Sequence, residues 1–184
     1  MILTRIETPN LLLLACEADA ARALVESRIL ARKVIGYRLM EGWPGAELLE
    51  RLPGYVSSVE RDPSLLGWGV WLVIHERTRL VIGDTGFTSP PEPDGTVRIT
   101  FNMHEEFRGK GLATEAARAL LNWAFSWDGI RAVSARCSMN NEPARRVLEK
   151  IGMSPVGSSE DEILWRLGDG PDSSPVLPPS KEQP

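Results

Sequence analysis

Apolar side chains occupy every second position from residue 96 to residue 103. They are Val97, Ile99, Phe101 and Met103. This period of two predicts a β-strand with one face against a core. Two strand-like runs at 69–75 and 80–87 precede it, and short polar segments separate the three runs. Three successive strands joined in this way predict an antiparallel meander.

A broad apolar face runs along the segment 111–127. Its residues recur every three or four positions, in the rows Leu112, Ala116, Leu120, Ala124 and Ala113, Ala117, Leu121, Phe125. This period predicts an amphipathic helix. The polar stripe opposite is formed by Glu115, Arg118, Asn122 and Ser126. Because two adjoining rows are apolar, we expect the helix to pack flat on the sheet.

Shorter patterns predict the remaining elements. We expect further strands at 10–16, 131–137, 154–157 and 162–167, and further helices at 20–26 and 141–151. Asp19 is placed to cap the first of these helices, and Gly152 can supply the left-handed residue that ends the second. The segment 29–63 is the least regular, and turn residues within it leave room for two short helices at 46–51 and 55–60.

The turn between the strand at 96–103 and the long helix has the composition of an anion site. Gly109 and Gly111 let the backbone approach a ligand closely, and the first amides of a helix have no intrahelical acceptor. Such a turn binds a phosphate or a pyrophosphate. Its spacing is neither that of a P-loop nor G-x-G-x-x-G, since no Ser or Thr follows Lys110 and no glycine stands six residues before Gly109.

The spacing does fit R/Q-x-x-G-x-G/A, with Arg108, Gly111 and Ala113 in the named places. This motif resembles the coenzyme A pyrophosphate loop of the GNAT superfamily of acyl-CoA-dependent N-acetyltransferases. The segment 141–153 is similar to the second signature of that family, a helix that opens with N-x-x-S/A and ends with E-K-x-G-F. The resemblance covers most of residues 4–167, and it is greatest to the branch that acetylates ribosomal-protein N-termini.

The resemblance implies an α+β fold of layered α/β type. Its centre is a mixed, mainly antiparallel sheet of about six to seven strands with helices on both faces. We expect residues 1–167 to form this single domain, because one core is usual up to about 250 residues. The tail 168–184 is rich in proline and has no apolar periodicity, so we expect it to be flexible.

The resemblance also implies an activity: transfer of an acetyl group from acetyl-CoA to a primary amine, by direct attack and without an acyl-enzyme. The amine belongs to a small molecule or to a protein N-terminus. The coenzyme-binding residues implied in this way come from the strand end, the glycine turn and the second helix. They are Met103, Arg108, Gly109, Lys110, Gly111, Leu112, Ala113, Thr114, Asn141 and Arg146. Asn140 could cap the second helix in place of Asn141, which would free Asn141 for the coenzyme.

Candidates for the group that takes the amine's proton are His104, Glu105 and Glu106, which follow the strand directly. A free carboxylate is a weak base toward an ammonium, so a working one needs burial or a water relay. The general acid is unassigned, because Ala144 and Leu148 stand where many relatives have a serine and a tyrosine. A non-catalytic acyl-CoA sensor is therefore an alternative, and a nucleotide-phosphate binder is a third.

The composition of the chain limits the kinds of partner that we expect for the protein. The chain has 25 acidic and 21 basic residues and a net charge of −4, so nucleic acid is not expected as a main partner. No run approaches the ~20 apolar residues of a membrane span. Two cysteines make no disulfide framework, which suits the cytoplasm, and the two histidines lack metal-ligand spacing. The protein is expected to be a monomer or a homodimer.

Five acidic residues lie before the glycine turn, and they would attract a cationic acceptor if folding brings them together. They are Asp84, Glu92, Asp94, Glu105 and Glu106.

Overall fold

In the computed structural model, which describes residues 4–169, one sheet of nine strands carries five α-helices and two 3₁₀ helices. The strands are β1 (Arg5–Glu7), β2 (Leu11–Ala15), β3 (Arg38–Leu39), β4 (Val70–His75), β5 (Leu80–Phe87), β6 (Thr96–Met103), β7 (Ala132–Ser138), β8 (Ser154–Ser158) and β9 (Glu162–Gly168). The helices are α1 (Ala18–Glu26), α2 (Arg28–Ile35), α3 (Ala46–Arg61), η1 (Pro63–Leu65), η2 (Glu105–Phe107), α4 (Leu112–Phe125) and α5 (Glu142–Lys150).

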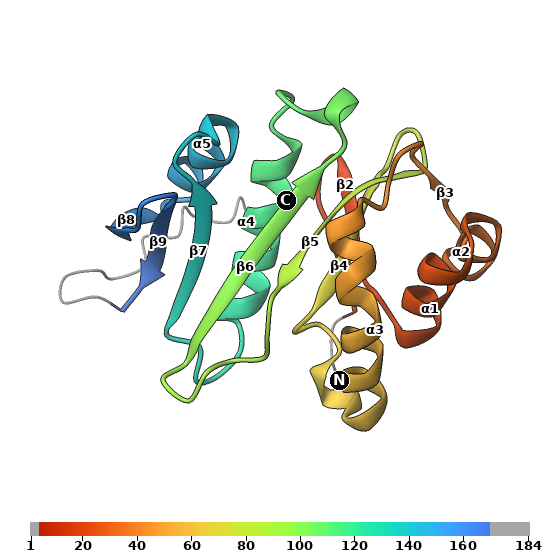
Figure 1. The fold of residues 1–184 in the computed structure, drawn as a ribbon, viewed down its shortest axis with the longest axis horizontal. Helices are drawn as coiled ribbons and strands as arrows, with labels where there is room; N and C mark the ends of the chain where they lie inside the picture. The colour runs from red at the N-terminus through yellow and green to blue at the C-terminus, as the bar shows by residue number, and fades with distance from the viewer. Residues whose placement is uncertain (1–3, 170–184) are drawn as a thin grey trace, which may run out of the picture.

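The sheet has the order β1-β2-β4-β5-β6-β7-β9-β8, and β3 pairs with β5 off this path (Figure 1). Only the β6–β7 and β3–β5 pairs are parallel. The predicted mixed and mainly antiparallel sheet, including the meander β4-β5-β6, is confirmed. The strand count is higher than predicted because β1 and β3 have three and two residues, too few to show a period of two.

Helices cover both faces of the sheet, as expected, and each face has its own apolar core. On one face α4 packs against the sheet, and the core there includes Trp71, Val73 and Leu120. On the other face α1 and α3 pack over Leu72 and Ile74 of the same strand. Figure 1 shows α3 in front of β4 and α4 behind the sheet. Because both faces of β4 are buried, the strand is apolar at nearly every position.

The segment 46–61 forms one helix, so the prediction of two short helices there was wrong. Pro53 lies inside α3, where it removes one backbone donor. Four residues at helical spacing nevertheless form a continuous buried stripe: Leu48, Leu52, Val56 and Val59. Their packing outweighs the local cost of Pro53. Helix α2 was not predicted at all, and Asp19 does not cap α1, since it lies in the first turn and pairs with Arg22 at 2.7 Å.

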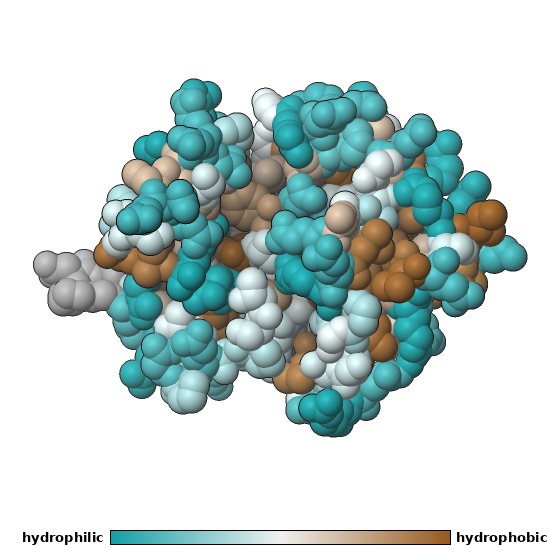
Figure 2. Space-filling model, in the orientation of Figure 1, coloured by the Kyte–Doolittle hydropathy of each residue, from teal (hydrophilic) through white to brown (hydrophobic). Residues whose placement is uncertain are grey.

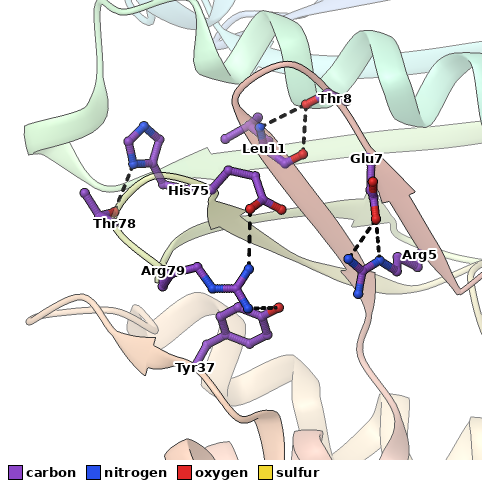
Figure 3. Close-up of polar contacts among 9 residues, drawn as sticks. Arg5, Glu7, Thr8, Leu11, Tyr37, His75, Thr78 and Arg79 are labelled. Atoms are coloured by element: carbon purple, nitrogen blue, oxygen red, sulfur yellow. Dashed lines mark hydrogen bonds and ion pairs between the residues drawn. The ribbon is translucent and has the colours of Figure 1, made fainter.

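The turn between β4 and β5 ties the sheet to the segment after α2. The Arg79 guanidinium lies 4.5 Å from the centroid of the Tyr37 ring and donates a hydrogen bond to its hydroxyl at 3.0 Å (Figure 3). In the same turn His75 Nδ1 lies 2.9 Å from the Thr78 hydroxyl oxygen. The contacts of Arg79 with Tyr37 hold the start of the loop that carries Trp43.

The last strand, β9, extends to Gly168, one residue past the predicted end of the domain. Most of the predicted tail, residues 170–184, lies outside the described residues. Within the described part, no helix combines the length and the apolar character that crossing a membrane requires. Residues 4–169 also contain no group of three or more His, Cys, Asp or Glu side chains placed to bind a metal ion.

Candidate active site

Strands β6 and β7 separate along their length and leave an opening in the sheet. They pair only over Thr96–Arg98 and Ala132–Ser134, although each has seven or eight residues. Figure 1 shows the two strands diverging toward α5 and the turn after β6. In Figure 2 apolar atoms lie set back from the surface in this region. The opening is therefore bordered by two strand edges and closed behind by α4.

The edge of β6 that faces this opening carries backbone groups without a strand partner. The Arg98 carbonyl accepts from the Thr88 amide and the His104 amide donates to Ile82, so the even-numbered positions of β6 bond to β5. Backbone groups alternate sides along a strand, which turns those of Phe101 and Met103 toward β7. Beyond Arg98, β7 no longer pairs with them. An extended ligand can pair with this edge as a strand would.

The glycine turn lies next to this opening, between η2 and α4. Gly109 has φ 72° and Gly111 has φ 78°, the left-handed conformation that favours glycine. A Cβ at either position would meet no atom within 4 Å, so the backbone here is open to a ligand. Within residues 4–169, the amides of Gly109, Lys110 and Gly111 have no hydrogen-bond acceptor. The first amides of α4 add to this set of donors.

The backbone amide of Arg108 is not available to a pyrophosphate. The Arg108 amide donates to the Glu105 carbonyl at 3.1 Å, because η2 is a closed 3₁₀ turn. The Arg108 side chain takes another part: its Nε donates to the Met103 carbonyl at 2.8 Å and links the turn to the end of β6. Lys110 Nζ donates to the Glu106 carbonyl at 2.7 Å and lies 5.1 Å from the Phe107 ring centroid. Both cations remain at the turn, beside its free amides.

Glu115 fixes the first turns of α4, a role that its position in the sequence does not reveal. Its carboxylate accepts from the Thr8 hydroxyl at 2.6 Å, from the Asn10 amide at 2.8 Å and from Asn10 Nδ2 at 3.0 Å. Thr8 also closes the β1–β2 turn through Leu11 (Figure 3). The three donor groups belong to two residues, both more than 100 positions away in the sequence.

The second predicted motif forms α5, beside the opening. Asn141 is its N-cap and accepts from the Ala144 amide at 3.1 Å, so of the two candidates it is Asn141, and not Asn140, that caps the helix. The Asn141 side-chain oxygen is thereby occupied. Arg146 pairs with Glu142 on the exposed side of α5. Gly152 has φ 89°, and the Met153 amide donates to the Leu148 carbonyl at 3.0 Å, as the predicted helix end requires.

The three proposed proton acceptors share one surface turn. His104 is half-buried and is the N-cap of η2, although its contact with the Glu106 amide is long at 3.4 Å. Glu105 and Glu106 are exposed. They do not meet Glu92 and Asp94, which precede the opposite end of β6. The eight residues of β6 place these two acidic pairs roughly 25 Å apart. The acidic residues that we expected to attract a cationic acceptor therefore do not form one cluster.

The structure adds a carboxylate that the sequence did not single out as a proton acceptor. Asp84 of β5 is only 6% exposed and accepts from Trp43 Nε1 at 2.9 Å. Burial raises its pKa to about 6, while the Trp43 hydrogen bond and the positive charge of Arg51 oppose the rise. Asp84 lies opposite Asn102 of β6. With this pKa the carboxyl group is partly protonated near neutral pH. A group that transfers protons works best when its pKa lies near the working pH.

A cavity of about 380 Å³ lies on the same face, between α3 and the ends of β4 and β5. Its lining includes Arg51, Tyr55 and Ser58 of α3, Val70 and Phe87 of the sheet, and the start of the β5–β6 loop. This volume is in the range of small-molecule sites. The lining mixes apolar side chains with one guanidinium and several hydroxyl groups. The least regular part of the sequence thus forms one wall of a pocket.

The family is decided by comparison with known sequences. The acetyltransferase (GNAT) domain matches residues 11–154, which include the opening, the glycine turn and α5. The chain belongs to the GNAT family. The predicted resemblance is confirmed, and the GNAT domain begins at β2 and extends to β8. The N-acetyltransferase YjdG of Bacillus subtilis, which has no characterised activity, is 29% identical over 160 residues, 87% of this chain and 95% of its own length.

Solved structures confirm the GNAT fold. The ribosomal-protein-S5-alanine acetyltransferase of Vibrio fischeri aligns with a TM-score of 0.64 and 15% identity, over 89% of this chain and 96% of its own. The microcin C7 self-immunity acetyltransferase MccE, solved with acetyl-CoA and AMP, aligns with a TM-score of 0.62 and 15% identity, over 88% and 94% of the chains. At this identity the likeness concerns the fold of this GNAT domain alone.

Proposed function

We propose that the protein transfers an acetyl group from acetyl-CoA to a primary amine by direct attack. One observation carries the proposal: the free amides at Gly109, Lys110 and Gly111 lie beside the opening where β6 presents an unpaired backbone edge. A pyrophosphate needs the amides, and a pantetheine arm with its amide groups needs the edge. Acetyl-CoA has both parts joined in one molecule, and a simple nucleotide has only the first.

The coenzyme contacts follow from this placement. Amides from Gly109 through Ala113 receive the pyrophosphate, and the half-buried Thr114 hydroxyl adds a donor. The Met103 amide faces the opening and pairs with pantetheine or polarises the thioester carbonyl. Leu112 contributes its backbone only, since its side chain is buried. Asn141, the N-cap of α5, and Arg146, midway along this helix, would contact the coenzyme from the other side of the opening.

The burial of both cysteines favours direct attack by the amine over an acyl-enzyme intermediate. Cys16 and Cys137 are both buried, and burial raises the pKa of Cys16 to about 12. A neutral thiol is a poor nucleophile, so Cys16 is not suited to an acyl-enzyme. The departing coenzyme thiolate, with an ordinary pKa near 8.5, can take its proton from water. Leu148, where many relatives have a tyrosine, is 1% exposed and belongs to the core.

The acceptor enters from the α3 face in this proposal. The cavity beside Arg51 and Tyr55 opens there, on the side of the sheet opposite α4. A small amine fits its volume, and so does the first side chain of a protein N-terminus. Ribosomal-protein acetyltransferases occur among the structural neighbours, so peptides with N-terminal alanine or serine belong among the acceptors to be tested.

The test is release of free coenzyme A thiol. The protein is incubated with acetyl-CoA and a panel of amino acids, polyamines, aminoglycosides and N-terminal peptides, and the thiol is followed with a chromogenic reagent. We expect turnover with at least one acceptor and a rise in melting temperature with coenzyme A alone. Coenzyme binding without turnover would make the protein an acyl-CoA sensor. If saturating coenzyme A leaves the melting temperature unchanged, both functions are excluded.

A pair of glycine variants separates binding from general damage. Gly111→Ala puts a Cβ on a left-handed residue within the proposed pyrophosphate turn, and we expect coenzyme affinity to fall at least 10-fold. Gly36→Ala is the matched control, because Gly36 at the end of α2 has the same φ of 78° and no atom within 4 Å of an added Cβ. Equal coenzyme affinity in the two variants would contradict the placement of the pyrophosphate.

A further inference from the structure

Asp84 is the only buried carboxylate in the part of the chain that the structure describes. A buried charged side chain is rare unless a partner compensates for its lost hydration. Its hydrogen-bond donors are neutral groups, the indole of Trp43 at 2.9 Å and the side chain of Asn102. No ion pair of residues 4–169 includes it. A neutral hydrogen bond leaves much of this cost uncompensated. An Asn at this position would accept the same bond without the cost of a buried charge.

The surroundings hold Asp84 in place from several elements. The Arg28 guanidinium donates to the Trp43 and Met40 carbonyls and so fixes the loop that carries the indole. From α3, the charge of Arg51 lowers the pKa of Asp84, and that of Glu47 raises it. Cys16, directly after β2, is neutral because burial raises its own pKa. Asn102 faces Asp84 from β6.

The position of Asp84 connects the acceptor side to the opening. Its neighbour Gly83 pairs with Met103, the last residue of β6. One strand spacing, about 5 Å, separates Asp84 from the strand whose far edge lines the opening. Asn102 is exposed, so solvent reaches the α3 face of the sheet directly beside Asp84.

We propose that Asp84 takes the proton of the acceptor ammonium, through one water molecule, in the acetyl transfer. The inference rests on the proposed function. It replaces the surface turn of His104, Glu105 and Glu106 in that role, because two of those side chains are exposed and all three lie beyond the end of β6. Desolvation, which makes a carboxylate a better base, acts on Asp84.

Atoms and charges balance in this step. One proton of the ammonium passes through water to Asp84, and the neutral amine attacks the thioester carbonyl carbon. A nitrogen–carbon bond forms, and the carbon–sulfur bond breaks as the tetrahedral intermediate collapses. The second proton of the nitrogen ends on the departing thiolate, directly or through solvent. Asp84 then releases its proton to water, so that amide, coenzyme A thiol and one free proton are the products.

The experiment compares Asp84→Asn with wild type. Asn keeps the size of the side chain and a carbonyl oxygen for Trp43, so a purely structural role predicts near-normal kcat. Proton transfer by a positioned group contributes on the order of 100-fold or more, and we expect kcat to fall by about that factor with little change in KM. Coenzyme A must still raise the melting temperature of the variant. Asp161→Asn, at an exposed residue, is the matched control.

The pH profile distinguishes proton transfer from positioning. In wild type kcat should rise with pH through the region of pH 6 as Asp84 loses its proton, and this limb should be absent from Asp84→Asn. It should persist in His104→Asn and Glu106→Gln. In Trp43→Phe it should move to higher pH, because the hydrogen bond that is lost lowers the pKa of Asp84 in wild type. An unchanged kcat in Asp84→Asn, or loss of the limb in His104→Asn or Glu106→Gln, overturns this inference and leaves the transferase intact. If wild type acetylates no amine in the panel, both proposals fall.

Discussion

Replacing Asp84 by Asn should change how stability depends on pH. The folded-state pKa of Asp84 is about 6 against an ordinary value of 3.8. Between these values the folded protein retains a proton that the unfolded chain has released, so the stability due to this group falls as pH rises. The difference is about 2 pH units, and at ~1.4 kcal/mol per unit it corresponds to about 3 kcal/mol. The burial is nearly complete, so solvent screening reduces this little.

The amide of the Asp84→Asn variant does not titrate, so the variant lacks this dependence. Relative to wild type, it should therefore gain about 3 kcal/mol of unfolding free energy between pH 4 and pH 7. Urea denaturation at pH 4, 5, 6 and 7, followed by tryptophan fluorescence, measures the difference. Equal m-values in the two proteins show that the surface exposed on unfolding is the same.

Asp94→Asn is a control with the opposite sign. Hydrogen bonds from Thr96 lower the pKa of Asp94, so its contribution to stability is present at neutral pH and is lost as pH falls through the folded-state pKa. Its variant should lose stability relative to wild type as pH rises toward the ordinary pKa of 3.8, and the difference should then stay nearly constant from pH 4 to pH 7. If the Asp84→Asn and wild-type curves run parallel from pH 4 to pH 7, Asp84 is not desolvated and the reasoning about its pKa is refuted.

Three further substitutions test the framework of the site. Glu115→Ala removes the acceptor for Thr8 and Asn10 and should cost about 2 kcal/mol by urea denaturation, most of it recovered in Glu115→Gln. Asn141→Ala removes the α5 cap and should cost ~1 kcal/mol; no loss of stability would show that water replaces the cap. Gly86→Ala places a Cβ 2.0 Å from the Gly69 carbonyl oxygen and should cost ~3 kcal/mol or abolish folding, which expression level and melting temperature report.

The centre of the fold could be predicted because its patterns are long and regular. Strand β6 has the predicted bounds, and α4 begins one residue after its predicted start. Both elements bury a face against a core that the other helps to build, so their apolar periods are complete. The positive φ of Gly109 and Gly111 also follows from composition, since a strand-to-helix turn with two glycines needs such conformations.

The α3 face could not be predicted in the same way. Pro53 and Gly54 resemble a break in the sequence, and only tertiary packing of the stripe around Leu52 shows that the helix continues. The choice of Asn141 over Asn140 as the cap depends on the backbone of one turn. The prediction of a single acidic cluster was wrong for a different reason. The residues before and after β6 are close in sequence but lie at opposite ends of an extended strand.

The direction in which the Asp84 side chain points depends on an irregularity of β5 that no residue pattern reveals. Val81 pairs with Ile74 and Gly83 pairs with Val73, so Ile82 is an extra residue in β5. Val81 faces α3, and strict alternation from it would turn Asp84 toward α4, into an apolar core without a donor. The bulge moves Asp84 to the side of Leu72 and Trp43 instead. Bulges are frequent next to active sites because they redirect a side chain, and here the redirected group is the one to which we assign the proton.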